Sequence, residues 1–423
     1  RFYDSTSPNS FGIGIEGRRQ FSAFSANGGQ AFTNDIQVDG ISVQGSAWNE
    51  VAVLPNADGI KEVRTNINNF TAEYGRAQSV ISVTTKSGTN EFHGSGFFRH
   101  RNDALNANSW GSNARGLQRP EFKVYTFGGT FGGPVIKDKR FFFASYEGLQ
   151  FDQGVNFLRT VPTELERKGD FSKTVVNVRG KPAQLNLFDP FAVVPEGNNV
   201  YRRLPVPGDI IARPHPGILK LYSFYPAPNR TPDDAYNHNN FLNPAMREFT
   251  RHNLNSRVDH RLSDNHSLYF TAGLTKGQIN TPSSWGAGNP FNSSLEGYAM
   301  DTGDDDPYAS LGNTWVATPT MVVDLRFGVN RINTRALTPA IEGFNYSDFG
   351  IPAYIQAANA LPGVPPNMFP GGNYRWSEIT RNAYQHKHER QTNHHLVGSV
   401  TKTYQRWTFK FGGEIRNLLS NYT

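Results

Sequence analysis

The stretch M-V-V-D-L-R-F-G-V-N at residues 321–330 decides the fold class of this chain. Its apolar and polar side chains take turns, and this period of two places them on opposite faces of a β-strand. The same alternation recurs at residues 268–274 and 407–416. In the first stretch, Val323, Leu325, Phe327 and Val329 alternate with Asp324, Arg326, Gly328 and Asn330.

Two antiparallel architectures share this alternation. A sandwich buries the apolar face and exposes the polar face to water, whereas an outer-membrane barrel turns the apolar face to lipid and the polar face to a wet interior. Charges of both signs on the polar face favour the barrel, because they would line its interior as mixed pairs. The candidate lining residues are Asp324, Arg326, Lys410, Glu414 and Arg416.

The lengths of the connections also favour the barrel. Alternating segments are joined in turn by tight polar turns and by long connections, as in barrels with short periplasmic turns and large extracellular loops. The long connections cover about residues 101–121, 151–249, 278–306 and 335–391. The nine predicted strands cover about residues 92–100, 122–132, 140–150, 250–262, 266–277, 307–317, 320–334, 392–403 and 406–418.

Composition excludes several other classes. No apolar run approaches the ~18 residues of a membrane helix, which excludes a helical membrane protein. The 423 residues contain no cysteine, which fits export to an oxidising compartment. The net charge of +6 is spread along the chain without a basic and aromatic cluster, so nucleic acid is not an expected partner. Because G-x-S-x-G, H-E-x-x-H and P-loop motifs are lacking, we expect no catalytic residues and no enzyme.

Residues 1–91 are too irregular for a barrel wall and are expected to form a small α/β unit, with the barrel strands in residues 92–423. Several of its motifs resemble the plug of TonB-dependent outer-membrane transporters of the Oar-like subgroup. These are V-D-G-I (38–41), P-N-A-D-G-I-K-E-V-R (55–64), A-E-Y-G-R (72–76) and T-K-S-G-T-N-E-F-H-G-S (85–95). The resemblance continues at residues 127–148, V-P-T-E-L-E-R-K-G-D-F-S (161–172), Y-P-A-P-N (225–229) and R-V-D-H-R-L-S-D-N-H-S-L (257–268).

The resemblance implies a plug inside a barrel of about twenty-two strands. It also implies import of a nutrient ligand, powered by the inner-membrane TonB complex through a region before the plug. Nine strands would leave two bare edges, so either the remaining strands lie beyond Thr423 or another chain supplies them. We favour the first and expect the chain to be an internal piece of a longer protein. The plug and gating candidates are Asp39, Gly40, Glu73, Tyr74, Gly75, Arg76 and Lys86.

Two alternatives remain open for the plug motifs. Glu73 and Arg76 would make polar contacts with the charged wall, or they would serve packing and solubility within the plug together with Lys86. Gly40, Gly75 and Gly88 are expected in tight turns, where a positive φ costs glycine little.

Metal and ligand sites are weaker predictions. His386 and His388 share one face of an extended chain and would allow chelation of a metal ion, although a polar loop descending into a strand, with His394 or His395 at the interface, is the reading we favour. The acidic run at residues 301–306, including Asp304 and Asp306, would offer oxygen ligands to calcium, but a solvated loop tip is favoured and no cofactor is expected. Candidate ligand-contacting aromatic residues in the loops are Trp110, Trp285, Tyr374 and Trp376, with packing among the loops as the alternative.

Three functions are compared. The first is a TonB-dependent transporter in the bacterial outer membrane, with outer-membrane lipid, the TonB complex and an unidentified imported ligand as partners. The second is a structural or adhesive outer-membrane protein whose long loops bind surface partners. The third is a soluble β-rich carbohydrate-binding protein. We favour the first.

Overall fold

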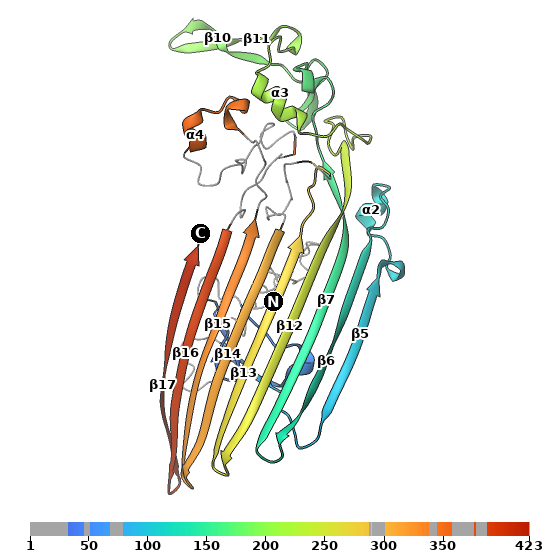
Figure 1. Ribbon diagram of the computed structural model, residues 1–423. Helices are drawn as coiled ribbons and strands as arrows, with labels where there is room; N and C mark the ends of the chain where they lie inside the picture. The colour runs from blue at the N-terminus through green and yellow to red at the C-terminus, as the bar shows by residue number, and fades with distance from the viewer. Residues whose placement is uncertain are drawn as a thin grey trace.

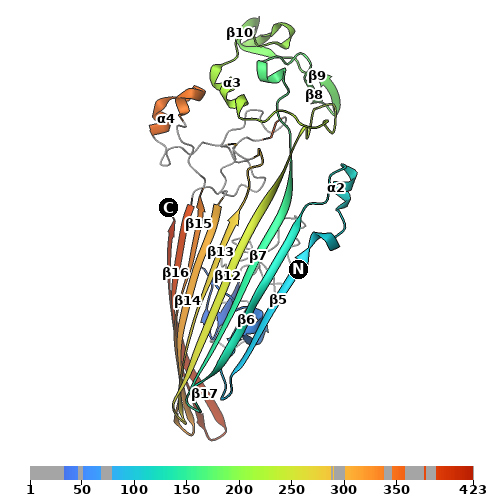
Figure 2. The same ribbon diagram turned by 45° about the vertical axis from the view of Figure 1, so that its right-hand side comes forward.

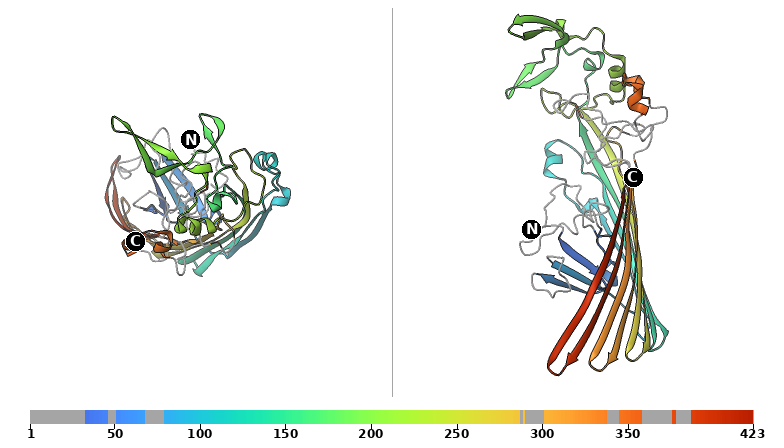
Figure 3. Two further views of the ribbon diagram at one scale, coloured as in Figure 1. Left: turned by 90° about the horizontal axis from the view of Figure 1, so that it is seen from above. Right: turned by 90° about the vertical axis from the view of Figure 1, so that its left-hand side faces the viewer.

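Two β-sheets organise the molecule, a curved wall and a smaller sheet on its concave side (Figures 1 and 3). The computed structural model describes residues 33–45, 51–67, 79–286, 289, 301–337, 345–357, 376–377 and 387–422. None of the helices in these ranges is long and apolar enough to cross a membrane.

The wall is a nine-stranded antiparallel sheet in the order β17-β16-β15-β14-β13-β12-β7-β6-β5. It is open, with β5 and β17 at its edges. All nine strands predicted from alternation are present, and the short turns lie together at one end (Figure 1). The strands are β5 (His93–Asn102), β6 (Phe122–Ile136), β7 (Arg140–Arg159), β12 (Phe241–Ser263), β13 (His266–Asn280), β14 (Asp301–Thr318), β15 (Met321–Leu337), β16 (Lys387–Tyr404) and β17 (Trp407–Tyr422).

The wall is apolar outside and polar inside. Leu325 and Phe327 are 49% and 46% exposed, whereas Asn330 on the other face of the same strand is 1% exposed. Further exposed apolar residues are Leu254, Val258, Phe270, Leu274, Leu311 and Leu396, and further buried polar residues are Asn253, Asn255, Thr271, Ser310, Gln391, Asn393 and His395. A sandwich would bury the first set, so this distribution confirms the predicted barrel wall and excludes the sandwich.

The strands run further than the alternation predicted. β7 continues to Arg159 and β12 begins at Phe241, where the sequence indicated a loop. The ladder of backbone hydrogen bonds is continuous, and Phe241 pairs with Arg159 at its end. Polar and apolar residues alternate only in the part of a strand that has one apolar face. The sequence pattern therefore ends where that apolar face ends, although the backbone hydrogen bonding of the strand continues.

The smaller sheet, here called the plug, has the strand order β2-β1-β4-β3. Its strands are β1 (Asn34–Val38), β2 (Ile41–Ser42), β3 (Ile60–Ile67) and β4 (Ser79–Thr85). β1 and β4 are parallel, and the other pairs are antiparallel. A short helix η1 (Ala57–Gly59) precedes β3, and Asn56 caps it by accepting from the Gly59 amide at 2.8 Å. The core of the plug contains Ile36, Val38, Val43, Val51, Val53 and Val83.

The connection between β7 and β12 carries most of a cap at the end opposite the tight turns (Figure 2). It contains η4 (Glu166–Lys168), β8 (Val175–Val178), β9 (Lys181–Gln184), β10 (Phe188–Gly197), β11 (Val200–Pro205), η5 (Pro207–Asp209) and α3 (Pro216–Ser223). The connection between β5 and β6 contains η3 (Asp103–Leu105) and α2 (Trp110–Ala114), and the one between β15 and β16 contains η6 (Tyr346–Phe349) and α4 (Ala353–Ala357).

A buried aromatic core holds the cap together. Its members come from three long connections and from the first residue of β12, and are Val161, Phe171, Leu221, Tyr222, Tyr225, Phe241, Trp285 and Trp376. The Arg167 guanidinium donates to main-chain carbonyls at Pro162, Tyr222, Tyr225 and Pro226. Burial raises the pKa of the Tyr222 hydroxyl to about 12, so this group stays protonated in the core.

Candidate functional site

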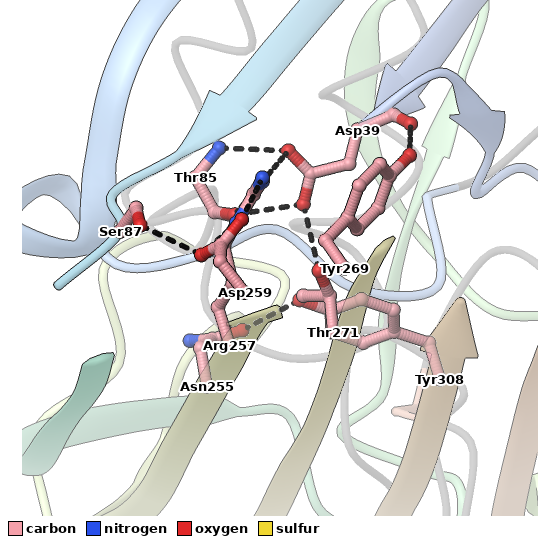
Figure 4. A network of polar contacts seen from close by, with 9 residues as sticks. All are labelled: Asp39, Thr85, Ser87, Asn255, Arg257, Asp259, Tyr269, Thr271 and Tyr308. Atoms are coloured by element: carbon pink, nitrogen blue, oxygen red, sulfur yellow. Dashed lines mark hydrogen bonds and ion pairs between the residues drawn. The ribbon is translucent and has the colours of Figure 1, made fainter. Parts of the chain in front are cut away.

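The plug meets the wall through a buried polar network centred on Asp39, in the turn between β1 and β2 (Figure 4). The Asp39 side chain is 2% exposed. One carboxylate oxygen accepts from the Thr85 amide and the Arg257 guanidinium, each at 3.0 Å. The other accepts from the hydroxyls of Thr85 at 2.7 Å and Thr271 at 3.0 Å. A carboxylate with four donors is well satisfied although it is out of water.

Arg257 connects this plug carboxylate to the wall. It lies on β12 and is also paired with Asp259 two residues along the same face, with Nη2 to Oδ1 at 2.8 Å. Its guanidinium lies 4.5 Å from the centroid of the Tyr269 ring, and the Tyr269 hydroxyl donates to the Asp39 main-chain carbonyl at 2.6 Å. Side chains on β12 and β13 therefore hold both the side chain and the backbone of Asp39.

A second contact covers the free edge of the plug sheet. The Ser42 amide donates to Nδ1 of His395 at 3.1 Å, and the Ser42 carbonyl accepts from the Asn330 side-chain amide at 2.8 Å. The Asn393 amide donates to the carbonyl of Gln44. Since an exposed strand edge would leave these backbone groups to water or to another strand, the side chains of β15 and β16 act as a substitute strand.

Asp35 on β1 anchors the same edge through charge. Its carboxylate accepts from the Arg416 guanidinium of β17 at 2.9 Å and from the Ser42 hydroxyl at 2.7 Å. Arg416 also lies 3.1 Å from Glu414, whose carboxylate is 3.0 Å from Nε2 of His395. Because Nδ1 of His395 accepts from Ser42, Nε2 carries the proton and donates to Glu414. Asp35 and Asp39 thus form two ion pairs with different wall strands.

Glycines allow the two sheets to approach closely. A Cβ on Gly328 of β15 would lie 2.4 Å from Cγ2 of Ile41, and one on Gly40 would lie 2.6 Å from the Arg326 guanidinium. Gly40 has a φ of +82°, as expected for its turn. The expectation that Gly88 serves a tight turn is corrected. A Cβ added at this position would lie 2.2 Å from the carbonyl oxygen of Phe142, so glycine is required here because there is no room for a side chain.

A cavity of about 440 Å³ lies beside the network, between the plug and the wall. Its plug side is apolar and includes Ile36, Leu54 and Val83, whereas its wall side carries Glu147 and Arg251. It therefore presents an apolar face and a charged face to the same space, next to the contacts that hold the plug.

The comparisons with known proteins agree with this geometry. Residues 84–423 match the model of the outer membrane beta barrel domain family, which is most of the chain. The chain belongs to this family. It is also 33% identical over 150 residues to the TonB-dependent transporter Oar of Myxococcus xanthus, across 32% of this chain and 14% of Oar. The predicted resemblance to TonB-dependent outer-membrane transporters and the bacterial outer-membrane location are thereby confirmed.

Two solved structures are similar to this chain at low identity. The outer membrane transporter YddB from Escherichia coli is 12% identical with a TM-score of 0.48, over 92% of this chain and 46% of YddB. The FrpB iron transporter from Neisseria meningitidis is 11% identical with a TM-score of 0.41, over 92% of this chain and 53% of FrpB. The chain thus spans about half the length of these structures.

In this family member, the predicted lining residues divide into plug contacts and wall contacts. Arg416 pairs with Asp35 of the plug and with Glu414 beside it on β17, and Arg326 packs against Gly40 of the plug. Asp324 lies 3.8 Å from Arg326 and accepts from the Thr314 hydroxyl at 2.7 Å. Lys410 is exposed on β17.

Of the predicted plug residues, Asp39 is the centre of the network, and the exposed side chain of Lys86 makes no ion pair with a described residue. The Lys86 backbone amide donates to the Gly59 carbonyl at 2.9 Å. Glu73, Tyr74, Gly75 and Arg76 lie outside the described residues, so their assignment stays a prediction.

The ligand-loop prediction is wrong for two tryptophans. Trp285 and Trp376 are 3% and 8% exposed in the core of the cap, so packing among the loops explains them. Trp110 is 85% exposed on α2, and Tyr374 lies outside the described residues. An aromatic residue in a polar loop gives the same sequence signal whether it faces a ligand or another loop.

The expected acidic loop is a strand. Asp304 and Asp306 lie on β14. Asp304 accepts from the Thr334 hydroxyl at 3.0 Å, and Asp306 accepts from the main-chain amide of Asn333 at 2.9 Å. His388 lies on β16, 2.8 Å from the Asn333 side chain, and His386 is outside the described residues. Within the described ranges, no three His, Asp or Glu side chains are grouped to hold a metal ion.

Several network residues were not singled out from sequence: Asp35, Thr85, Arg257, Asp259, Tyr269 and Thr271. One signal was available, because R-V-D at residues 257–259 places an arginine and an aspartate on one face of a strand. For the others, alternation indicates only that they face inward.

Proposed function

We propose that this chain is the plug and part of the wall of a TonB-dependent active transporter, in which movement of the plug admits an unidentified ligand across the outer membrane. The observation that supports this most is the polar character of the plug–wall contact. Asp39 with Arg257 and Asp35 with Arg416 join the plug to an inner strand, β12, and to the edge strand β17 of the wall sheet.

Such a contact suits a gate for an energetic reason. In a dry interior, removing one partner of a buried ion pair costs about 3–5 kcal/mol, so the closed state is well defined. When water reaches the pair, the separated groups are hydrated, and the net stabilisation that the ion pair contributes falls to about 0–1 kcal/mol. An apolar interface would instead lose about 25 cal/mol for each Å² exposed to water.

The cavity supplies a place where opening would begin. Asn253, which lines it, donates to the Leu54 carbonyl of the plug at 2.8 Å, and the Asn255 amide in turn donates to Asn253. Water that enters this space would reach the hydrogen bonds around Asp39 through these amides. A pull on the plug by the TonB complex would then separate groups that are already being hydrated.

Labelling of one buried position tests the proposal without knowledge of the ligand. Ser310 on β14 is 3% exposed and pairs with Thr271 on one side and Gly328 on the other, so it lies between the two plug contacts. The 423 residues contain no cysteine, so Ser310→Cys adds a single thiol to this region, and its labelling is measured as the increase over the parent protein. In cells expressing the full-length protein, we expect a membrane-impermeant maleimide to label it only when TonB is present and the inner membrane is energised.

Asn113→Cys in the exposed helix α2 is the matched control, and it should be labelled equally in every strain. Equal labelling of Ser310→Cys in TonB-containing and TonB-null cells would refute energy-coupled movement of the plug.

A second candidate function is favoured by the cap. The β10–β11 hairpin projects from it with Phe191 and Tyr201 exposed at 92% and 62%. A structural or adhesive protein would use such a hairpin to bind a surface partner. Labelling of Ser310→Cys that never depends on TonB, together with stable co-purification of a surface protein, would favour this function.

A further inference from the structure

The outer face of β15 changes character at one level. Its outward positions read Val323, Leu325, Phe327 and Val329, and the next are Arg331, Asn333 and Arg335. On the antiparallel neighbour β16, Leu396 and Val400 face outward below this level and His388 and Arg390 above it. Arg331 pairs with Thr392, Asn333 with Arg390 and Arg335 with His388, so the basic residues of the two strands lie side by side.

Three guanidinium groups form this outer basic patch, defined here as Arg331, Arg335 and Arg390. All three residues are exposed. Arg331 donates to the Thr392 hydroxyl at 2.9 Å, Arg390 donates to His388 at 3.2 Å, and the Arg335 guanidinium lies over Gly303 of β14. These contacts spread the charges over three strands.

The patch is not neutralised by the described part of the chain. None of its guanidinium groups forms an ion pair there, whereas Lys276 on the outer face of β13 is 3.8 Å from Asp305. Among the carboxylates on and beside these strands, Asp304 and Glu389 are 7% and 2% exposed and belong to the buried inner face, and Asp305 on the outer face is the partner of Lys276. The outer face therefore carries three positive charges directly beside an apolar belt.

We propose that the outer basic patch binds the phosphate groups of anionic lipids in the outer leaflet of the membrane. Arg331 is two residues above Val329, or about 7 Å along the strand. A lipid whose acyl chains contact Phe327 and Leu396 would place its headgroup at the level of Arg331. Arginine forms paired hydrogen bonds with phosphate, and cations at a membrane surface are attracted to anionic headgroups. Continuity with the apolar belt favours a lipid over a free anion.

Lipid binding by the purified full-length protein tests the proposal. In a mild detergent, native mass spectrometry would compare lipid A, which is a phosphorylated glycolipid, with its dephosphorylated form and with inorganic phosphate. Each arginine should contribute about fivefold, so the triple variant Arg331→Gln, Arg335→Gln, Arg390→Gln should bind lipid A on the order of 100-fold more weakly.

A variant with the same loss of charge at the opposite rim is the control. Lys137→Gln, Lys139→Gln, Arg406→Gln removes three cations from the tight turns and should bind lipid A as the parent does. If the triple variant fails to fold, Arg331→Gln alone should still show the fivefold loss. The proposal is overturned if dephosphorylated lipid A binds as tightly, if both variants weaken binding equally, or if inorganic phosphate competes as well as the lipid.

Discussion

At the residue scale, Asp39 determines how the plug is held. Its turn supplies a positive φ at both Asp39 and Gly40, which turns the carboxylate toward β4 and β12 while the carbonyl meets Tyr269. A single residue of the V-D-G-I motif thus contacts its own sheet and two strands of the wall.

Removing the cation of this pair should loosen the plug. Arg257→Met leaves the Asp39 carboxylate buried without its charged partner, at a cost of about 3–5 kcal/mol. We expect the plug to become accessible to protease at lower urea concentration in the purified full-length protein. The double variant Asp39→Asn, Arg257→Met should recover part of the loss, because the buried Asp39 site then carries no charge, while Asp259, whose side chain is 23% exposed, keeps contact with water.

Arg406→Met in an exposed turn is the control for loss of one arginine and should behave as the parent does. If the double variant is no more resistant than Arg257→Met alone, the charge of Asp39 does not determine the effect.

At the scale of elements, the contact of β2 with β15 suggests a reversible lock. The Cβ of Ile41 lies 3.1 Å from the position that a Cβ on Gly328 would take, close to the ~3.5–4.5 Å between Cβ atoms in disulfides. The variant Ile41→Cys, Gly328→Cys also removes the Ile41 atoms that would clash. In its oxidised form it should abolish TonB-dependent labelling of a third cysteine at position 310, and a reductant should restore the labelling.

A disulfide within the wall is the matched control. Ser95 and Thr130 face each other on β5 and β6, with their hydroxyl oxygens 2.8 Å apart. Ser95→Cys, Thr130→Cys should leave the plug free to move. Full labelling in the oxidised plug–wall variant would show that opening does not require β2 to leave β15.

At the scale of the whole molecule, the distribution of polarity makes a prediction about the solvent. Phe327→Arg puts a cation on the apolar outer face, and in lipid vesicles it should lower the free energy of unfolding by about 2–4 kcal/mol if the residue lies near the bilayer midplane. Urea titration of the reconstituted full-length protein would measure this. Phe191→Arg in the cap is the control and should be neutral, whereas a neutral Phe327→Arg would contradict the lipid-facing assignment.

The sequence predicted the wall well because its signal is local. A period of two and tight polar turns located all nine strands. It could not predict the wall partners of Asp39 or the contacts that assemble the aromatic core of the cap, because these include residues more than 200 positions apart, such as Asp39 with Arg257 and Phe171 with Trp376. The prediction of a loop at residues 301–306 was wrong because it relied on a local signal alone. Asp and Gly favour turns locally, but hydrogen bonding to β13 and β15 holds these residues in a strand.

The hairpin at the summit of the cap has a practical consequence. Asn198 and Asn199 both have positive φ in the bend between β10 and β11, remote from the tight turns and from the plug (Figure 2). A peptide epitope spliced between these two asparagines would be displayed to the medium on a stalk that the rest of the protein does not depend on. Antibodies against it would then count the molecules on living bacteria.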